Sequence, residues 1–181
     1  MSKPTNIILI GFMGSGKTSI AKKLKKVSGF DLLDTDKAII QETQKTISTL
    51  FETEGEEAFR DRETTHCKHL QHRTNTIIST GGGTILRAEN RALLQKAGWV
   101  VYLDTSLAEI LKRMANDKVR PLLQVEDRET KIKELKAQRE PLYRQTAHFY
   151  VDTTGKSVTT IANYIWKQYQ HYLGDPHVRR S

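Results

Sequence analysis

Residues 11–18 read Gly-Phe-Met-Gly-Ser-Gly-Lys-Thr, a complete G-x-x-x-x-G-K-T pattern between an apolar run at Asn6–Ile10 and a helical periodicity. Glycines in such a loop let successive backbone N–H groups turn toward one anion, and the following helix N-terminus adds partial positive charge. The pattern predicts a nucleotide site in which Lys17 reaches the β- and γ-phosphates and the Thr18 hydroxyl binds Mg²⁺. It leaves open whether the γ-phosphoryl group passes to water, to a small molecule or to nothing.

The rest of the chain alternates short apolar runs with helical patterns. The strand-like runs are Asn6–Ile10, Phe30–Leu33, Thr76–Ser79, Trp99–Leu103 and, more weakly, His148–Val151. Apolar residues spaced for helices lie between them, and Gly29 and Gly98 stand where two helices are expected to end. Because a parallel connection needs a helix-length crossover, this alternation predicts a doubly wound α/β fold, with a parallel sheet covered by helices on both faces.

Length and composition narrow the class further. The 181 residues suit one globular domain, and residues 174–181 are expected to form a loose tail. The single cysteine, Cys67, cannot close an intramolecular disulfide, which fits a reducing compartment. No apolar stretch approaches the ~20 residues of a membrane span. We therefore expect a cytoplasmic protein with no membrane partner.

The chain is basic, with 29 Lys and Arg against 21 Asp and Glu and a formal charge of +8. Such a charge suits a nucleic acid, a membrane surface or a site for small anions. The densest basic cluster consists of Lys22, Lys23, Lys25 and Lys26. It lies on the expected outer face of the first helix, with no aromatic residues interleaved as a nucleic-acid site would favour. We interpret it as a solvated helix face and expect no nucleic-acid partner.

A second Mg²⁺ ligand is usually an Asp at the end of an apolar strand, and two positions compete for that role. Asp104 ends the stronger apolar run, but Asp104-Thr105-Ser106 directly precedes a helix, so we favour a capping role for this segment. Asp34-Thr35-Asp36 ends the second run, where one carboxylate could lie near a metal and the other near a substrate. A helix is expected to begin here too, and capping by Asp34 is an equally good interpretation.

Two motifs suggest an acceptor site. Gly81-Gly82-Gly83 ends the third run, at the sheet edge where α/β proteins bind ligands, and would allow close approach to the backbone or unusual backbone angles. A plain flexible turn would have the same composition. Phe59-Arg60-x-x-Glu63 places Arg60 and Glu63 one helical turn apart, a spacing that is more often a surface ion pair.

Three arginines and a long aperiodic stretch complete the candidates. Asp117–Glu129 is rich in charge and lacks periodicity, as is typical of a functional lid. Arg113 and Arg120 fall in or beside it, and Arg139 lies further along the chain. Arginine suits bidentate binding of a carboxylate or phosphate, although each of these three residues taken singly is more often a surface side chain.

Taken together, these motifs resemble the shikimate kinases, which phosphorylate the 3-hydroxyl of shikimate with ATP. The resemblance covers roughly Asn6 to Trp166. It rests on the GFMGSGKT loop, Asp34-x-Asp36, Phe59-Arg60-x-x-Glu63, the three glycines, Arg113 seven residues before Arg120-Pro121-Leu122, and Arg139. The family implies a five-stranded parallel sheet of order 2-3-1-4-5 in one P-loop kinase domain, residues 1–173, with an acceptor-binding subdomain at 36–62 and a lid at 112–129.

The resemblance also implies a role for each matching residue. Nucleotide contacts fall on Gly14, Ser15, Gly16, Lys17, Thr18, Ser19, Arg113 and Arg120. Shikimate contacts fall on Asp36, Arg60, Gly81, Gly82, Gly83 and Arg139. Lys17, Asp36 and Arg120 would act in phosphoryl transfer, with Asp36 as the candidate base. Thr18 and Asp34 would hold Mg²⁺.

One departure and two rival functions stand beside this prediction. The segment Asp152–Ser157 lacks the proline that relatives often carry there, so its adenine contacts stay open. A gluconate or nucleoside monophosphate kinase would share the loop and a lid without calling for the acceptor motifs. A nucleic-acid-binding P-loop NTPase is the rival from another class. The resemblance implies an ATP- and Mg²⁺-dependent shikimate kinase, and we expect it to act as a monomer.

Overall fold

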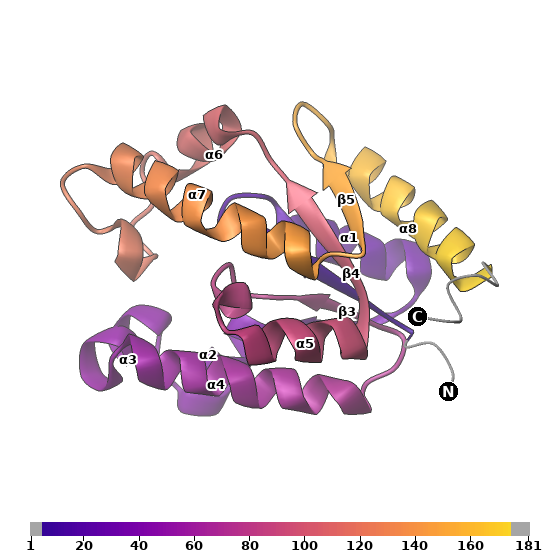
Figure 1. The fold of residues 1–181 in the computed structure, drawn as a ribbon, viewed down its shortest axis with the longest axis horizontal. Coiled ribbons are helices and arrows are strands. Elements are labelled where there is room, and N and C mark those ends of the chain that lie inside the picture. The colour runs from indigo at the N-terminus through magenta and orange to yellow at the C-terminus, as the bar shows by residue number, and fades with distance from the viewer. Residues whose placement is uncertain (1–4, 175–181) are drawn as a thin grey trace.

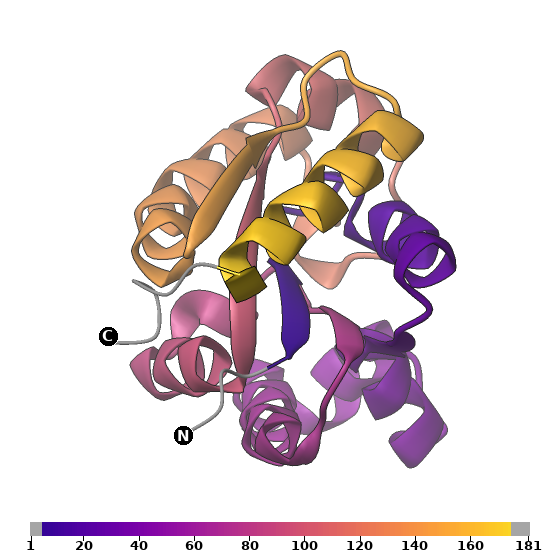
Figure 2. The ribbon, with the colours of Figure 1, turned by 90° about the vertical axis from the view of Figure 1, so that its right-hand side faces the viewer.

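The computed structural model describes residues 5–174, which contain one sheet of five parallel strands in the order β2-β3-β1-β4-β5 (Figures 1 and 2). The strands are β1 (Asn6–Ile10), β2 (Asp31–Asp34), β3 (Thr76–Ser79), β4 (Gly98–Asp104) and β5 (Phe149–Asp152). Each lies within one residue of the run predicted for it at either end. The predicted strand order and parallel pairing are confirmed.

Helices connect the strands. They are α1 (Lys17–Ser28), α2 (Thr35–Thr43), α3 (Ile47–Glu54), α4 (Glu56–His69), α5 (Ala88–Ala97), α6 (Leu107–Met114), α7 (Arg128–Thr146) and α8 (Val158–Gly174), with the short 3-10 helices η1 (Leu70–His72), η2 (Thr84–Leu86) and η3 (Pro121–Leu123). Within residues 5–174, no helix has the length and apolar character needed to cross a bilayer. The predicted tail at 174–181 falls almost wholly outside the described residues.

The alternation of side chains along the strands builds a core on each face of the sheet. Ile7 and Leu9 of β1 pack with apolar residues of α1 and α8. Ile8 and Ile10 point the other way, into a core formed with α5, α6 and α7. Figure 2 shows the sheet nearly edge-on between these helices. The predicted doubly wound α/β fold is therefore confirmed.

The two glycines predicted to end helices differ in their roles. Gly29 ends α1 in the left-handed conformation, with φ 75°, as predicted. Gly98 follows α5 but is extended and begins β4. A Cβ at Gly98 would lie 2.7 Å from the Asn6 carbonyl oxygen, so glycine is needed there for the close approach of β4 to β1.

The connections at the carboxyl ends of the strands position the site. The phosphate-binding loop follows β1, α2 follows β2, and the three glycines follow β3, all at one edge of the sheet. Residues 36–62 run through α2, α3 and the first half of α4, and residues 112–129 run from the end of α6 to the start of α7. In Figure 1 the segment that contains η3, just before α7, lies over α3, and these two elements are in contact.

Candidate active site

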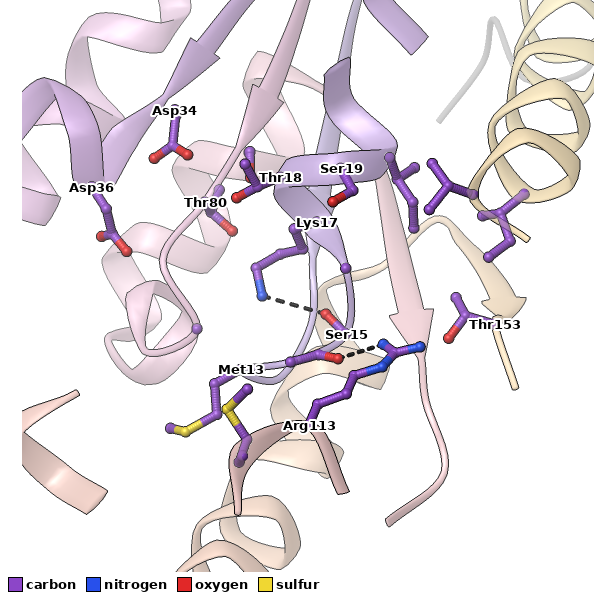
Figure 3. A pocket seen from close by; sticks show the side chains of 18 of the residues that line it. Met13, Ser15, Lys17, Thr18, Ser19, Asp34, Asp36, Thr80, Arg113 and Thr153 are labelled. Atoms are coloured by element: carbon purple, nitrogen blue, oxygen red, sulfur yellow. Dashed lines mark hydrogen bonds between the residues drawn. The ribbon is translucent and has the colours of Figure 1, made fainter. Parts of the chain in front are cut away.

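The loop after β1 is shaped to surround an anion. Gly14 and Gly16 adopt φ values of 77° and 87°, a region in which a side chain would be strained. The Lys17 ammonium reaches back across the loop and donates to the Gly11 and Phe12 carbonyl oxygens at 2.6 and 3.0 Å. Its contact with the Ser15 hydroxyl is drawn in Figure 3. Because helix α1 begins at Lys17, its first N–H groups face the same space without intrahelical partners.

A cavity of about 400 Å³ opens above this loop. The nucleotide residues that the sequence predicted all line it, namely Gly14, Ser15, Gly16, Lys17, Thr18, Ser19, Arg113 and Arg120. The Ser15 N–H donates to the Phe12 carbonyl, so this one amide is used inside the loop. Arg113 donates to the Gly14 carbonyl at 2.6 Å (Figure 3). Thr153 and Lys156 also line this cavity. The structure thus brings the segment whose contacts stayed open into the same cavity.

Burial lowers the pKa of Lys17 to about 7. The charges of Arg120 and Arg139 act in the same direction, while Asp36 opposes them. The ammonium is therefore poorly stabilised by the protein alone. A bound polyphosphate would supply the missing negative charge, so this electrostatic environment favours an anionic ligand beside Lys17.

The hydrogen-bond partners of Asp34 and Asp104 distinguish the two candidate positions for a second Mg²⁺ ligand. Asp34 Oδ1 accepts from the Lys37 N–H at 3.1 Å and caps α2, and the same side chain faces the nucleotide cavity near Thr18 (Figure 3). Capping and cavity lining therefore coexist at Asp34. The capping role favoured for Asp104-Thr105-Ser106 is confirmed at Ser106, which caps α6, and not at Asp104, whose carboxylate pairs with Arg144 at 3.1 Å.

A second cavity of about 100 Å³ lies between the glycines, α4, α7 and the segment predicted to be the lid. The predicted acceptor residues all line it, namely Asp36, Arg60, Gly81, Gly82, Gly83 and Arg139. Four residues line both cavities: Met13, Asp36, Gly82 and Arg120. The nucleotide cavity and the acceptor cavity therefore meet, and a carboxylate and a guanidinium lie at their junction.

The Arg60–Glu63 pair is buried, which corrects the surface pair that its spacing favoured. Arg60 Nη1 donates to Glu63 Oε2 at 2.7 Å, and the Glu63 side chain is 1% exposed. Thr84 donates to the other carboxylate oxygen at 2.8 Å. The sequence did carry a signal, because Phe59, Glu63 and Cys67 recur every four residues on one helix face, and all three are buried.

Arg139 is a buried cation that has no carboxylate partner among the described residues. It is 2% exposed on α7, with its guanidinium 5.9 Å from the centre of the Phe12 ring. Among residues 5–174, no carboxylate lies within ion-pair distance of it, whereas Arg60 is neutralised by Glu63. The buried Nε atoms of both arginines lack hydrogen-bond partners in the described chain. Buried, unpaired cationic groups favour an anionic ligand.

Asp36 presents the complementary feature. Its buried Oδ1 accepts no hydrogen bond from the described residues. Burial raises the pKa of Asp36 to about 6, and the nearby Glu63 and Asp34 carboxylates add to this shift. The carboxylate is still mostly ionised at neutral pH, so it can accept a hydrogen bond from a ligand hydroxyl.

The three glycines serve close approach and do not adopt left-handed backbone angles. A Cβ at Gly81 would lie 2.7 Å from Asp36 Oδ1, and one at Gly83 would lie 2.5 Å from Arg60 Nη1. The close-approach interpretation of this motif is therefore correct, and it is the protein's own charged side chains that approach the turn.

Arg120 lies in the segment predicted to be the lid, at the junction of the two cavities, and forms an ion pair with Asp117. Asp117 Oδ1 also accepts from the Val119 and Arg120 N–H groups, so the pair belongs to one short loop. Sequence reasoning missed Asp117. It also missed Tyr143, whose hydroxyl donates to the Gly82 carbonyl across 61 positions of sequence.

The doubly wound sheet, the phosphate-binding loop after β1 and the adjoining acceptor cavity define a P-loop kinase that acts on a small molecule. Comparisons with known proteins agree: residues 13–170 match the family described as shikimate kinase. The shikimate kinase of Thioalkalivibrio sulfidiphilus is 42% identical over 170 residues, 94% of this chain and 90% of that protein. That of Nitrosomonas europaea is 46% identical over 156 residues, 86% of this chain and 74% of that protein.

A solved structure supports the same assignment. The shikimate kinase of Acinetobacter baumannii in complex with shikimate has a TM-score of 0.89 to this chain at 41% identity, covering 93% of this chain and 94% of that one. The chain belongs to the shikimate kinase family. It is an ATP-dependent kinase, as predicted.

Proposed function

We propose that this chain transfers the γ-phosphoryl group of ATP to the 3-hydroxyl of shikimate, giving shikimate 3-phosphate and ADP for aromatic amino acid biosynthesis. The observation that carries this proposal is the junction of the two cavities. An unpaired cation, Arg139, lies on the acceptor side, and the phosphate-binding loop lies on the other. A small anion with hydroxyl groups fits this arrangement, and shikimate is a monoanion with three hydroxyls.

The acceptor side supplies complementary groups for each part of shikimate. The Arg139 guanidinium, with Arg60 beside the glycine turn, is suited to the carboxylate. Asp36 Oδ1 has a free lone pair for the ring hydroxyls. Because Arg60 is already neutralised by Glu63, Arg139 contributes most of the charge attraction.

In the transfer step, the 3-hydroxyl oxygen forms a bond to the γ-phosphorus while the bond from the γ-phosphorus to the bridging oxygen of ADP breaks. Asp36 orients the hydroxyl and accepts its proton as the new bond forms. Lys17 and Arg120 hold the negative charge on the transferred group from two sides. The transition state of such a reaction is loose, so positioning contributes more than the basicity of Asp36.

The metal ligands and the boundaries of the moving parts are part of the same proposal. The Thr18 hydroxyl and Asp34 fit Mg²⁺, because both face the nucleotide cavity and the second Asp34 oxygen accepts no hydrogen bond within residues 5–174. Mg²⁺ bound there would neutralise phosphate charge. Residues 36–62 form the acceptor-binding subdomain, and residues 112–129 form the lid.

We further propose that the enzyme acts as a monomer in the cytoplasm and binds neither nucleic acid nor membrane. Every proposed site residue comes from one copy of the chain, so a second copy adds nothing to the chemistry. The Lys22, Lys25 and Lys26 side chains are exposed on α1, as a solvated helix face would be. Cys67 is buried and unpaired by any disulfide, which suits a reducing compartment.

The test is ADP release with ATP and Mg²⁺ in the presence of shikimate, gluconate, a nucleoside monophosphate, mixed-sequence DNA or no acceptor. We expect strong release with shikimate alone, together with shikimate 3-phosphate as the product by mass spectrometry. Release with gluconate or a monophosphate instead would assign a different kinase. Equal release in every sample would indicate an NTPase and contradict the proposal.

Replacing Gly83 with Ala is expected to raise the KM for shikimate by about tenfold or more while leaving the KM for ATP within about twofold. The added Cβ would lie 2.5 and 2.7 Å from the two terminal nitrogens of Arg60, which Glu63 holds in place. Gly174→Ala is the matched control, since a Cβ there meets no atom of residues 5–174 within 4 Å. Steady-state kinetics with each substrate varied would check this. An unchanged KM for shikimate would mean that Arg60 moves freely.

A further inference from the structure

Tyr143 lies on α7, one turn after Arg139, and its hydroxyl donates to the Gly82 carbonyl oxygen at 2.6 Å. Its side chain is buried, and its ring stacks on Tyr102 of β4 with 5.1 Å between centroids. We propose that Tyr143 is a positioning residue for the acceptor, because its hydroxyl fixes the glycine turn relative to Arg139. This inference rests on the proposed function and deepens it.

The bond to Gly82 acts on a turn that has spare donors. Gly81 is already fixed, because its N–H donates to Thr35 and its carbonyl accepts from Thr84. Within residues 5–174, the Gly82 and Gly83 N–H groups donate to no protein acceptor. Since the peptide bonds are trans, fixing the Gly82 carbonyl also fixes the Gly83 N–H, which points the opposite way. Tyr143 therefore sets the direction of the Gly83 N–H, a donor of a residue that lines the acceptor cavity.

The same hydroxyl lies beside the principal acceptor cation. Burial raises the pKa of Tyr143 to about 12, and the Arg139 guanidinium acts against this shift, which reflects their proximity. The hydroxyl is consequently protonated throughout the working pH range and remains a donor to Gly82. Two elements far apart in sequence, the turn after β3 and helix α7, are thus coupled through one oxygen atom. Without this hydroxyl, the glycine turn and Arg139 are no longer held at fixed positions relative to each other, and the groups proposed to bind the carboxylate are misaligned.

Tyr169 provides a matched control inside the same chain. It is also buried, its hydroxyl donates to the Thr5 carbonyl at 2.7 Å, and its ring stacks on Trp166 with 5.5 Å between centroids. It belongs to the core on the other face of the sheet and lines neither cavity. Replacing either tyrosine with Phe removes one buried hydroxyl and one bond to a main-chain carbonyl. A purely structural role would therefore give the two variants the same kinetic behaviour.

The experiment compares Tyr143→Phe, Tyr169→Phe and the unchanged chain. For Tyr143→Phe we expect the KM and the calorimetric Kd for shikimate to rise about tenfold, with the KM for ATP within about twofold. For Tyr169→Phe we expect both constants for shikimate to stay at the values of the unchanged chain. Thermal unfolding midpoints should fall by similar amounts in the two variants. Equal shikimate constants in the two variants would overturn the inference.

A rescue variant separates the donor from the ring. Tyr143→4-aminophenylalanine keeps an N–H donor at the same place, so the shikimate KM should return most of the way to that of the unchanged chain. If Tyr143→Phe does not fold, this variant alone carries the test, because its weaker donor should raise the shikimate KM measurably while the KM for ATP stays unchanged. Where Tyr143→Phe folds, a shikimate KM that stays as high with 4-aminophenylalanine as with Phe would overturn the inference. Where it does not fold, a rise in the KM for ATP equal to the rise for shikimate would overturn it. Failure of the unchanged chain to phosphorylate shikimate would instead refute the proposed function.

Discussion

Replacing Asp36 with Asn is expected to lower kcat with shikimate about a thousandfold and, at pH 7.5, to raise the thermal unfolding midpoint by about 5 °C. The activity is expected to fall because the amide cannot both accept a hydrogen bond from the 3-hydroxyl in the required orientation and take its proton. The stability rises because the substitution removes a carboxylate whose buried oxygen has no hydrogen-bond partner in residues 5–174. Loss of function together with gain of stability is the signature of a group retained for chemistry.

The raised pKa of Asp36 determines how the stability difference between the variant and the unchanged chain depends on pH. The folded pKa of Asp36, about 6, lies above the ordinary value of 3.8, so the folded chain binds the proton more tightly than the unfolded chain. Ionisation therefore costs the folded state about 3 kcal/mol above pH 6, and this cost disappears as the pH falls below about 4. The variant's advantage in unfolding temperature should follow the same course.

Calorimetric unfolding from pH 4 to 8, alongside kcat, would measure both effects. Asp31→Asn is the matched control, because it replaces an exposed carboxylate of the neighbouring strand, β2, outside both cavities. A variant less stable than the unchanged chain at pH 7.5 would contradict the electrostatic argument. Recovery of near-normal turnover by Asp36→Asn at high pH would contradict the positioning argument.

Replacing Lys17 with Met is expected to lower kcat by at least about a thousandfold, while the Kd for shikimate stays within about threefold. The ammonium lies in the nucleotide cavity, where burial and two arginines leave it short of negative charge, so its strongest interaction is the one it makes with the phosphates. In the proposed function, acceptor binding relies on Arg139 and the glycine turn, so the affinity for shikimate should be retained.

Coupled ADP release and calorimetric titration with shikimate would measure the two quantities separately. Lys25→Met is the control, since Lys25 is exposed on the same helix, α1, and lines neither the nucleotide nor the acceptor cavity. Turnover of Lys17→Met within tenfold of the control would remove Lys17 from phosphoryl transfer. A large rise in the Kd for shikimate would show that the loop also shapes the acceptor cavity.

The sheet and the phosphate-binding loop could be predicted because their determinants are local. An apolar run followed by glycines, Lys17 and Thr18 contains the strand, the turn and the helix start in one segment, and the structure reproduces it. The strand boundaries could be predicted in the same way, since buried parallel strands are continuous apolar runs. Only the order of the strands needed the family resemblance.

The acceptor site was harder to predict from the sequence, because the roles of its residues depend on contacts with partners elsewhere in the chain. Spacing alone made Arg60 and Glu63 a surface pair, yet contacts with the glycine turn and Thr84 bury them. Position alone did not decide which residue of Asp104-Thr105-Ser106 caps the helix; Ser106 does so, and Arg144 pairs with the Asp104 carboxylate. No periodicity could have linked Tyr143 to Gly82.

The ion pair between Arg120 and Asp117 has a consequence for which ligands can bind to the proposed lid. The loop supplies its own counter-ion, which the Val119 and Arg120 amides hold in place. A chloride or a single sulfate offers the guanidinium little that Asp117 does not already provide. A triphosphate offers higher charge density and several oxygens at once, and it can displace Asp117 from the guanidinium. We therefore expect Arg120 to select anions by their charge. Chloride and sulfate should leave its ion pair with Asp117 intact, whereas the triphosphate of the phosphate donor should replace Asp117.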